Sequence, residues 1–176
     1  KALLSQKLSK SAILLMPWID LGIGSEKSLG KGLAMLHKNS MKDSPSQFGC
    51  DIDGFIGTSP QVKGWIKNWG ECFVKLRLIP QLNIARKWLI GFDNPNFYSQ
   101  LIKYLNKNKD QPSIVHGDLW KGNTAVQKNG KGIIFDPATW WADREVDIAM
   151  TKLFGGFSQE FYNGYEEIWE LPSSYK

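Results

Sequence analysis

The fold of this chain is decided by the stretch His116-Gly117-Asp118-Leu119-Trp120-Lys121-Gly122-Asn123, which is followed downstream by Asp136-Pro137-Ala138. An acid and an amide stand five positions apart in the first stretch, and the second stretch follows the apolar run 133–135. Each motif alone has an ordinary interpretation, because His-Gly-Asp is a common turn and Asp-Pro-Ala can simply end a strand. Their order and spacing together are much harder to explain by chance.

Three polar side chains in these motifs suit the transfer of a phosphoryl group. In catalytic loops with this spacing, the Asp accepts the proton of a substrate hydroxyl, and the Asn five positions later holds magnesium. One carboxylate and one amide oxygen, completed by phosphate oxygens and water, satisfy the octahedral preference of Mg²⁺. We therefore expect Asp118 to be the catalytic base, and Asn123 and Asp136 to bind the Mg²⁺ that accompanies ATP.

Longer segments of the chain closely resemble the fructosamine kinase family, also called ketosamine 3-kinases. The segments that carry the resemblance are 48–53, 56–61, 80–82, 116–123, 133–138, 142–151 and 153–157. The block from Asp143 to Gly156 is much more specific than His-Gly-Asp and the metal ligands, which are all that the wider aminoglycoside phosphotransferase superfamily shares. The resemblance runs from about Leu14 onward and implies a protein-kinase-like fold.

The resemblance also implies a reaction. It is the ATP-dependent phosphorylation of a sugar hydroxyl of ketosamines, the glycation adducts formed on amines. The phosphorylated product is unstable and releases the amine, so the reaction repairs glycated protein. Whether the acceptor is a small-molecule or a protein-bound ketosamine stays open. Two other functions are kept as alternatives: a kinase for another small alcohol, such as an aminoglycoside or a choline-like compound, and an inactive truncated lobe that acts only as a binding module.

The first strongly apolar run, from Ala12 to Ile19, is typical of a buried strand. In the kinase pattern this strand is the hinge, and adenine lies against it. The resemblance then assigns the carbonyl of Pro17 and the backbone N–H of Ile19 to nucleotide binding. Proline lacks an N–H but keeps the carbonyl that the base needs. A core or edge strand without any ligand is the alternative.

Several elements that a kinase places before its hinge have no match here. They are the glycine-rich loop over the phosphates, the strand lysine that pairs with them, and the helix glutamate that orients this lysine. We therefore expect the chain to be a fragment. Residues 1–24 would be the end of an N-lobe with the hinge, and residues 25–176 would be a kinase-like C-lobe that is incomplete at its C-terminus.

Apolar residues recur at helical steps between the hinge and the catalytic loop. Four helical segments are predicted, and their apolar residues are Leu29, Leu33 and Leu36; Trp65, Trp69, Phe73 and Leu76; Leu82, Ala85, Trp88 and Leu89; and Phe97, Leu101, Tyr104 and Leu105. Ser25 can cap the first helix, Pro80 should break or kink the second, and Gly91 should end the third. Most of the eight Trp residues should fill this helical core.

A hairpin is expected directly after the catalytic loop. Asn129-Gly130 is a strong hairpin signal between the predicted strands 124–127 and 132–135. This hairpin would bring Asn123 and Asp136 together, which lets two ligands that are separated in sequence share one ion. The predicted fold class is therefore α+β: a mainly helical, protein-kinase-like C-lobe, with a small antiparallel hairpin that carries the active site and an N-terminal hinge strand.

Four further residues around the loop have defined expectations. Trp120 either stacks on a sugar ring as a substrate-binding residue or packs the loop itself. Lys121 either reaches a phosphate or lies in solvent. By the resemblance, Asp147 braces the catalytic loop through backbone hydrogen bonds, although an ordinary carboxylate at a helix start is the alternative. His116 is expected to be a structural hydrogen-bonding residue, because Asp118 already supplies the base.

The composition argues against several classes of protein. The 22 Lys and Arg against 17 Asp and Glu give a net charge of only +5 without basic runs, so nucleic-acid binding gains no support. Cys50 and Cys72 have no C-x-x-C or His cluster near them, which indicates reduced core residues. No signal peptide is visible, and the run at 12–19 is too short to cross a bilayer. We expect a cytoplasmic protein without a membrane partner, and no oligomeric state is predicted.

Overall fold

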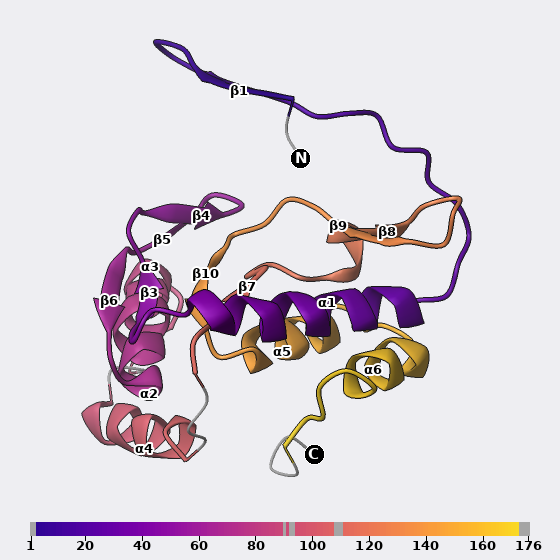
Figure 1. Cartoon of the computed structure of the whole chain (residues 1–176). Helices are drawn as coiled ribbons and strands as arrows, with labels where there is room; N and C mark the ends of the chain where they lie inside the picture. Colours follow the sequence, from indigo (N-terminus) through magenta and orange to yellow (C-terminus); the bar gives the residue numbers. More distant parts are fainter. Residues whose placement is uncertain (1–2, 90, 92–93, 108–110, 173–176) are drawn as a thin grey trace.

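The computed structural model describes residues 3–89, 91, 94–107 and 111–172 (Figure 1). Its helices are α1 (Lys27–Ser40), α2 (Trp69–Phe73), α3 (Ile79–Ala85), α4 (Pro95–Leu105), α5 (Glu145–Leu153) and α6 (Gln159–Glu166), with short turns η1 (Met41–Asp43), η2 (Val74–Leu78) and η3 (Lys121–Asn123). Its strands are β1 (Leu4–Lys7), β2 (Ala12–Leu15), β3 (Phe48–Cys50), β4 (Gly54–Ile56), β5 (Ser59–Gln61), β6 (Gly64–Ile66), β7 (Ser113–Val115), β8 (Thr124–Val126), β9 (Gly132–Ile134) and β10 (Trp140–Ala142). This mixture of helices and small antiparallel sheets confirms the predicted α+β class.

One four-stranded antiparallel sheet, in the order β6-β3-β10-β7, holds the two ends of the predicted site together. Trp140 on β10 lies opposite Val115 on β7, and Trp141 lies opposite Gly49 on β3. The predicted catalytic loop, residues 116–123, starts directly after β7, and the segment after Asp136 leads into β10. Both segments are therefore connected to the same pair of strands.

Two hydrophobic clusters form the core. The first joins α1, α5 and α6 and includes Leu119 of the catalytic loop, which is fully buried. The second surrounds the four-stranded sheet, where the rings of Trp69, Phe48 and Trp140 pack together. In Figure 1, α1 lies between the β8–β9 hairpin and the pair α5 and α6. The catalytic loop is thus anchored in the core by an apolar side chain as well as by its backbone.

Local signals account for the confirmed elements. Leu29 and Leu33 are buried on α1, and the Ser25 hydroxyl accepts a hydrogen bond from the Lys27 N–H at 3.0 Å beside the helix start. Asn94 caps α4 by accepting from two backbone N–H groups. The β8–β9 hairpin forms as expected within a residue at each strand, with Gly130 at φ 80° in its turn.

The predicted second helix is wrong at its start. Trp65 belongs to β6 and pairs with Gly49 of β3, so long-range strand pairing overrides the helical spacing of the aromatic residues.

Pro80 does not break the helical segment. A π-helical turn, η2, precedes α3, and the N–H of Ile79 donates to Val74 five residues back. Pro80 stands in the first turn of α3, where a missing N–H is tolerated. The third predicted helix extended to Leu89, whereas α3 ends at Ala85. Gly91, the predicted end of that helix, has a φ of 81°, and residue 90 lies outside the described residues.

The prediction of a buried hinge strand is half correct. β2 is a strand, but it covers only Ala12–Leu15, and all four residues are exposed because β2 pairs with β1 alone. Figure 1 shows this pair extending away from the rest of the chain. The division into residues 1–24 and 25–176 stays a prediction, and its outermost residues, 1–2 and 173–176, lie outside the described ones. Within the described part of the chain, no helix has the length and apolarity needed to span a membrane.

Helices α1 and α6 approach closely because glycines face the crossing. A Cβ atom at Gly30 of α1 would clash with the carbonyl of Phe161, and one at Gly164 of α6 would clash with the carbonyl of Lys27. Side chains at these positions would therefore separate the two helices. Gly32 lies on the same helix but on its exposed side, and a Cβ there would meet no atom within 4 Å.

We predict opposite effects for two alanine substitutions in α1. Gly30→Ala should lower the free energy of unfolding by about 1–3 kcal/mol, because the helices must move apart. Gly32→Ala, the matched control, should raise it by about 0.5–1 kcal/mol through helix propensity. Urea denaturation followed by circular dichroism measures both values. Equal effects of the two substitutions would contradict the close crossing.

Candidate active site

The catalytic loop lies against the segment that follows Asp136. The carbonyl of His116 accepts from the N–H of Ala138 at 2.8 Å. Gly117 has φ 83°, and a Cβ atom there would clash with the carbonyl of Ala138. Only glycine combines this left-handed backbone with such a close approach, so the fold requires glycine at the centre of His-Gly-Asp.

Asp147, on α5, holds the backbone of this loop. Its carboxylate accepts from the N–H groups of His116, at 2.7 Å, and Gly117, at 2.8 Å, and it also contacts His37 Nε2 at 3.0 Å. Asp147 and His37 are fully buried. The desolvation of a buried carboxylate is offset when several N–H groups donate to it. Asp147 thus joins α5 to the backbone of the loop at two consecutive residues.

His37 was missed by the sequence analysis. It extends a buried hydrogen-bonded chain, because its Nδ1 lies 2.9 Å from the hydroxyl of Tyr165, which Arg144 Nη1 contacts at 3.5 Å. A carboxylate can only accept, so Nε2–H of His37 donates to Asp147, and in the tautomer with that proton Nδ1 accepts from the Tyr165 hydroxyl. Burial raises the pKa of Tyr165 well above its usual range, which keeps the phenol protonated for this role. A polar residue four positions after Leu33, on the buried face of α1, is the signal that could have identified His37.

The predicted base and one predicted metal ligand are hydrogen-bonded to each other, and backbone pairing at the end of the β8–β9 hairpin holds the second predicted ligand nearby. Asn123 Nδ2 donates to the carbonyl of Asp118 at 2.8 Å and to its carboxylate at 3.2 Å. The N–H of Phe135 donates to the carbonyl of Asn123 at 3.1 Å, which brings the next residue, Asp136, beside the loop. No hydrogen bond among the described residues uses Asn123 Oδ1 or the carboxylate of Asp136. These oxygens are available to a cation.

Asp136 has an unusual backbone. Its φ of 56° is the one positive value among the described non-glycine residues, and this region costs about 1 kcal/mol or more for a residue with a Cβ. The preceding residue is fixed on both sides, because the carbonyl of Phe135 accepts from His116 Nε2 at 2.8 Å. The N–H of Asp118 lies 3.4 Å from His116 Nδ1, so the imidazole links the loop to the residue before Asp136.

Trp120 packs on the loop but stays partly exposed, and Lys121 pairs with a carboxylate, which neither of its two predicted roles included. The ring of Trp120 covers Gly122, where a Cβ would collide with it, and it lies edge-on to Phe154 at 6.3 Å, yet 41% of the residue is exposed. Lys121 is 60% exposed in its side chain, and its ammonium forms an ion pair with Glu26 at 2.9 Å. Partial burial opposes ionisation of Glu26, but Lys121 and the N–H of Ser158 outweigh it and lower the pKa of Glu26.

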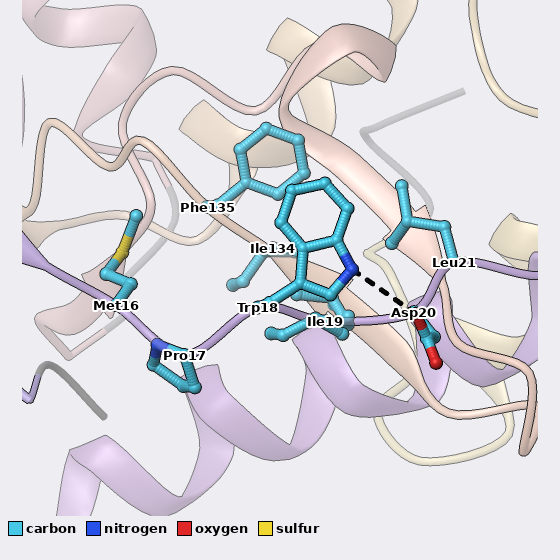
Figure 2. A pocket seen from close by; sticks show the side chains of 9 residues that line it. Met16, Pro17, Trp18, Ile19, Asp20, Leu21, Ile134 and Phe135 are labelled. Carbon is cyan, nitrogen blue, oxygen red and sulfur yellow. Dashed lines mark hydrogen bonds between the residues drawn. The ribbon is translucent and has the colours of Figure 1, made fainter.

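Figure 2 shows an apolar cavity of about 570 Å³. Residues 16–21 form one wall, and residues 133–135, which directly precede Asp136, form the other. Pro17 and Ile19 both line it. No hydrogen bond among the described residues uses the carbonyl of Pro17 or the N–H of Ile19, so a ligand could take both. Trp18, 91% exposed, stands between them and donates to Asp20 at 3.3 Å.

We expect Asp147 to dominate the stability of the loop. Asp147→Ala leaves three buried donors without an acceptor and should lower the free energy of unfolding by about 3–5 kcal/mol. The matched control is Asp20→Ala, which removes an exposed carboxylate 3.7 Å from Lys128 and should change stability by about 0.5 kcal/mol or less. Guanidinium denaturation measures both, and similar losses would argue against the role of Asp147.

Comparisons with known proteins agree with this architecture. The family model described as Fructosamine kinase matches residues 1–176. A "Probable ketoamine kinase" of Synechocystis sp. is 39% identical over 167 residues, which is 93% of this chain and 56% of the relative. One of Vibrio parahaemolyticus is 41% identical, over 83% of this chain and 50% of the relative.

Solved structures show the same similarity. The crystal structure of "Putative fructosamine-3-kinase" from Haemophilus somnus 129PT superposes with a TM-score of 0.80 at 31% identity, covering 93% of this chain and 56% of that one. The chain thus spans about half the length of the relatives it matches. Since the family model matches every residue from the first to the last, this chain belongs to the fructosamine kinase family.

Proposed function

We propose that this chain carries the catalytic loop of an ATP-dependent kinase that phosphorylates a sugar hydroxyl of a ketosamine. The observation that carries the proposal is the hydrogen bonding of Asn123 to Asp118, with Asp136 held close to Asn123 by the backbone bond from Phe135. The Oδ1 of Asn123 and the carboxylate of Asp136 are unused by described residues, and residues 133–135, just before Asp136, line an apolar cavity. The names of the relatives, ketoamine kinases, support the class of acceptor. Phosphorylation would make the adduct unstable and release the amine, which is a deglycation repair.

Asn123 and Asp136 would hold Mg²⁺. Their available donors are one amide oxygen and one carboxylate, a set that suits a hard cation whose other ligands are phosphate oxygens and water. The Nδ2 of Asn123 is already directed to Asp118, so its Oδ1 is the atom left for the ion. When bound, Mg·ATP supplies the phosphoryl group and neutralises its charge. The left-handed backbone of Asp136 would hold the carboxylate at this position.

Asp118 would act as the general base. Its carboxylate would accept the proton of the acceptor hydroxyl as the oxygen attacks phosphorus. The hydrogen bond from Asn123 Nδ2 keeps this carboxylate at a fixed distance from the metal ligand, while the N–H of Asp118 donates to His116. Positioning of this kind supplies much of the acceleration in phosphoryl transfer.

The two sides of the loop would bind different substrates. On the nucleotide side, the carbonyl of Pro17 and the N–H of Ile19 would bind adenine against the apolar wall of the cavity. On the other side, the exposed part of Trp120 would stack on the sugar, with its position fixed by Gly122 and Phe154. A cytoplasmic location and the absence of nucleic-acid partners stay predictions.

We predict that Asp118→Asn separates chemistry from binding. The amide is nearly isosteric but cannot accept the proton, so kcat for a fructosamine should fall about a hundredfold or more. The dissociation constant of Mg·ATP should change less than about threefold, because Asp118 does not bind the ion. Steady-state kinetics and calorimetry on the intact protein measure the two quantities. Undiminished turnover would remove Asp118 from the role of base.

Asp136→Ala should weaken the binding of the nucleotide, in contrast to Asp118→Asn. Loss of a magnesium ligand should weaken ATP binding about tenfold or more in the presence of Mg²⁺, and should have little effect when EDTA replaces the metal. Asp43→Ala, which removes an exposed carboxylate on η1, is the matched control and should leave both affinities unchanged. A loss of affinity that is equal with and without Mg²⁺ would contradict a metal-binding role for Asp136.

A further inference from the structure

A second cavity, of about 290 Å³, lies beside the catalytic loop and has no part in the roles assigned above. The strands β4 and β5, the turn η2 and the segment 137–139 enclose it. Its lining includes the side chains of Cys50, Gln61, Arg77 and Thr139. Its volume suits one portion of a small molecule, because sites for whole drug-sized ligands are usually larger.

The position of this cavity follows from the course of the chain. Residues 133–135 line the first cavity, Asp136 comes next, and residues 137–139 line the second. Ala138 also donates to the carbonyl of His116, two residues before Asp118. In a phosphoryl transfer the nucleotide lies on one side of the metal and the acceptor on the other. The linings of the two cavities are separated along the chain by Asp136 alone, which makes the second cavity the candidate for the acceptor.

Arg77 gives this cavity its charge. The residue is only 9% exposed, and its Nη1 donates to the carbonyls of Val62 and Leu76 at 2.8 and 2.9 Å. Its guanidinium lies over the ring of Trp140 at 3.9 Å. Its Nη2 also donates to Cys50 Sγ at 3.9 Å. These contacts fix the planar group in one orientation and use only part of its five N–H donors. Arg77 is thus a rigid, permanently charged donor.

No anion within the described chain balances this charge. Among the described residues no carboxylate forms an ion pair with Arg77, and no acidic side chain lines the cavity. The other polar groups on its wall, those of Gln61, Thr139 and Cys50, are neutral or weakly acidic. A buried cation is favourable only when paired or well hydrogen-bonded. An anionic group entering the cavity would complete the coordination of Arg77, and the planar fork of arginine suits a carboxylate in particular.

We propose that Arg77 binds the carboxylate of the acceptor, so that the acceptor is the ketosamine of a free amino acid. This inference rests on the proposed kinase function. In such an adduct the carboxylate is attached to the carbon that bears the glycated amine, close to the sugar. A glycated lysine inside a protein has no carboxylate at that place. Arg77 therefore selects small-molecule adducts over protein-bound ones.

The test compares two acceptors on the intact protein: the fructose adduct of valine and that of valinamide, which differ only in the charge of one group. We expect kcat/KM to be at least about tenfold higher for the valine adduct, and we expect this difference to arise from a lower KM. A difference of this size corresponds to one charge-assisted hydrogen bond. Arg77→Met should reduce this preference to about one and leave kcat/KM for the amide within about threefold. Arg86→Met, the matched loss of an exposed arginine, should keep the full preference.

Each outcome decides the proposal. Equal kcat/KM for both acceptors in the unaltered protein would overturn the carboxylate site and leave the kinase function intact. Phosphorylation of neither acceptor, with Mg·ATP still bound, would overturn the proposed function and this inference with it. Arg77 also supports η2, so Arg77→Met could unfold the protein, which thermal denaturation would reveal. In that event Arg77→Lys, which keeps the charge without the planar fork, should retain a reduced preference, and an unchanged or absent preference would contradict the proposal.

Discussion

The hydrogen bonds from two backbone amides to the buried carboxylate of Asp147 are the interaction on which the rest of the site depends. Backbone amides have no freedom to turn away once the carboxylate accepts from them, so the loop at His116 and Gly117 has one conformation. That conformation sets where Asp118 and Asn123 stand. It also sets the segment after Asp136, because Ala138 and Phe135 both bond to His116. A single buried charge thus orients two segments of chain.

This carboxylate is in turn held by the helical layer. His37 of α1 and Tyr165 of α6 continue the hydrogen-bonded chain from Asp147 of α5, and all three are fully buried. These hydrogen bonds require α1 and α6 to lie close together, which Gly30 and Gly164 permit. Apolar packing, including Leu119, excludes water from the same region and strengthens each polar contact. The packing of the helices therefore determines the geometry of the loop.

Local signals predicted much of this fold. The Asn-Gly turn gave the β8–β9 hairpin, because the left-handed conformation at Gly130 is chosen by two residues alone. Apolar periodicity gave both α1 and α4. The motif from His116 to Asn123, with Asp136 after a strand, indicated which side chains would meet. Each of these inferences needs only neighbours in sequence or a single hairpin.

Partners that are distant in sequence were decided by the tertiary structure. Trp65 is a strand residue because β3 pairs with β6, and β2 is exposed because only β1 pairs with it. The residues that stabilise or extend the site, His37 and Arg77, meet their partners across helices and sheets that spacing does not bring together. By itself the sequence determined the reactive groups and the turns between them. Their orientation, and the charge buried beside them, were decided by packing, since burial and long-range hydrogen bonds exist only once the elements assemble.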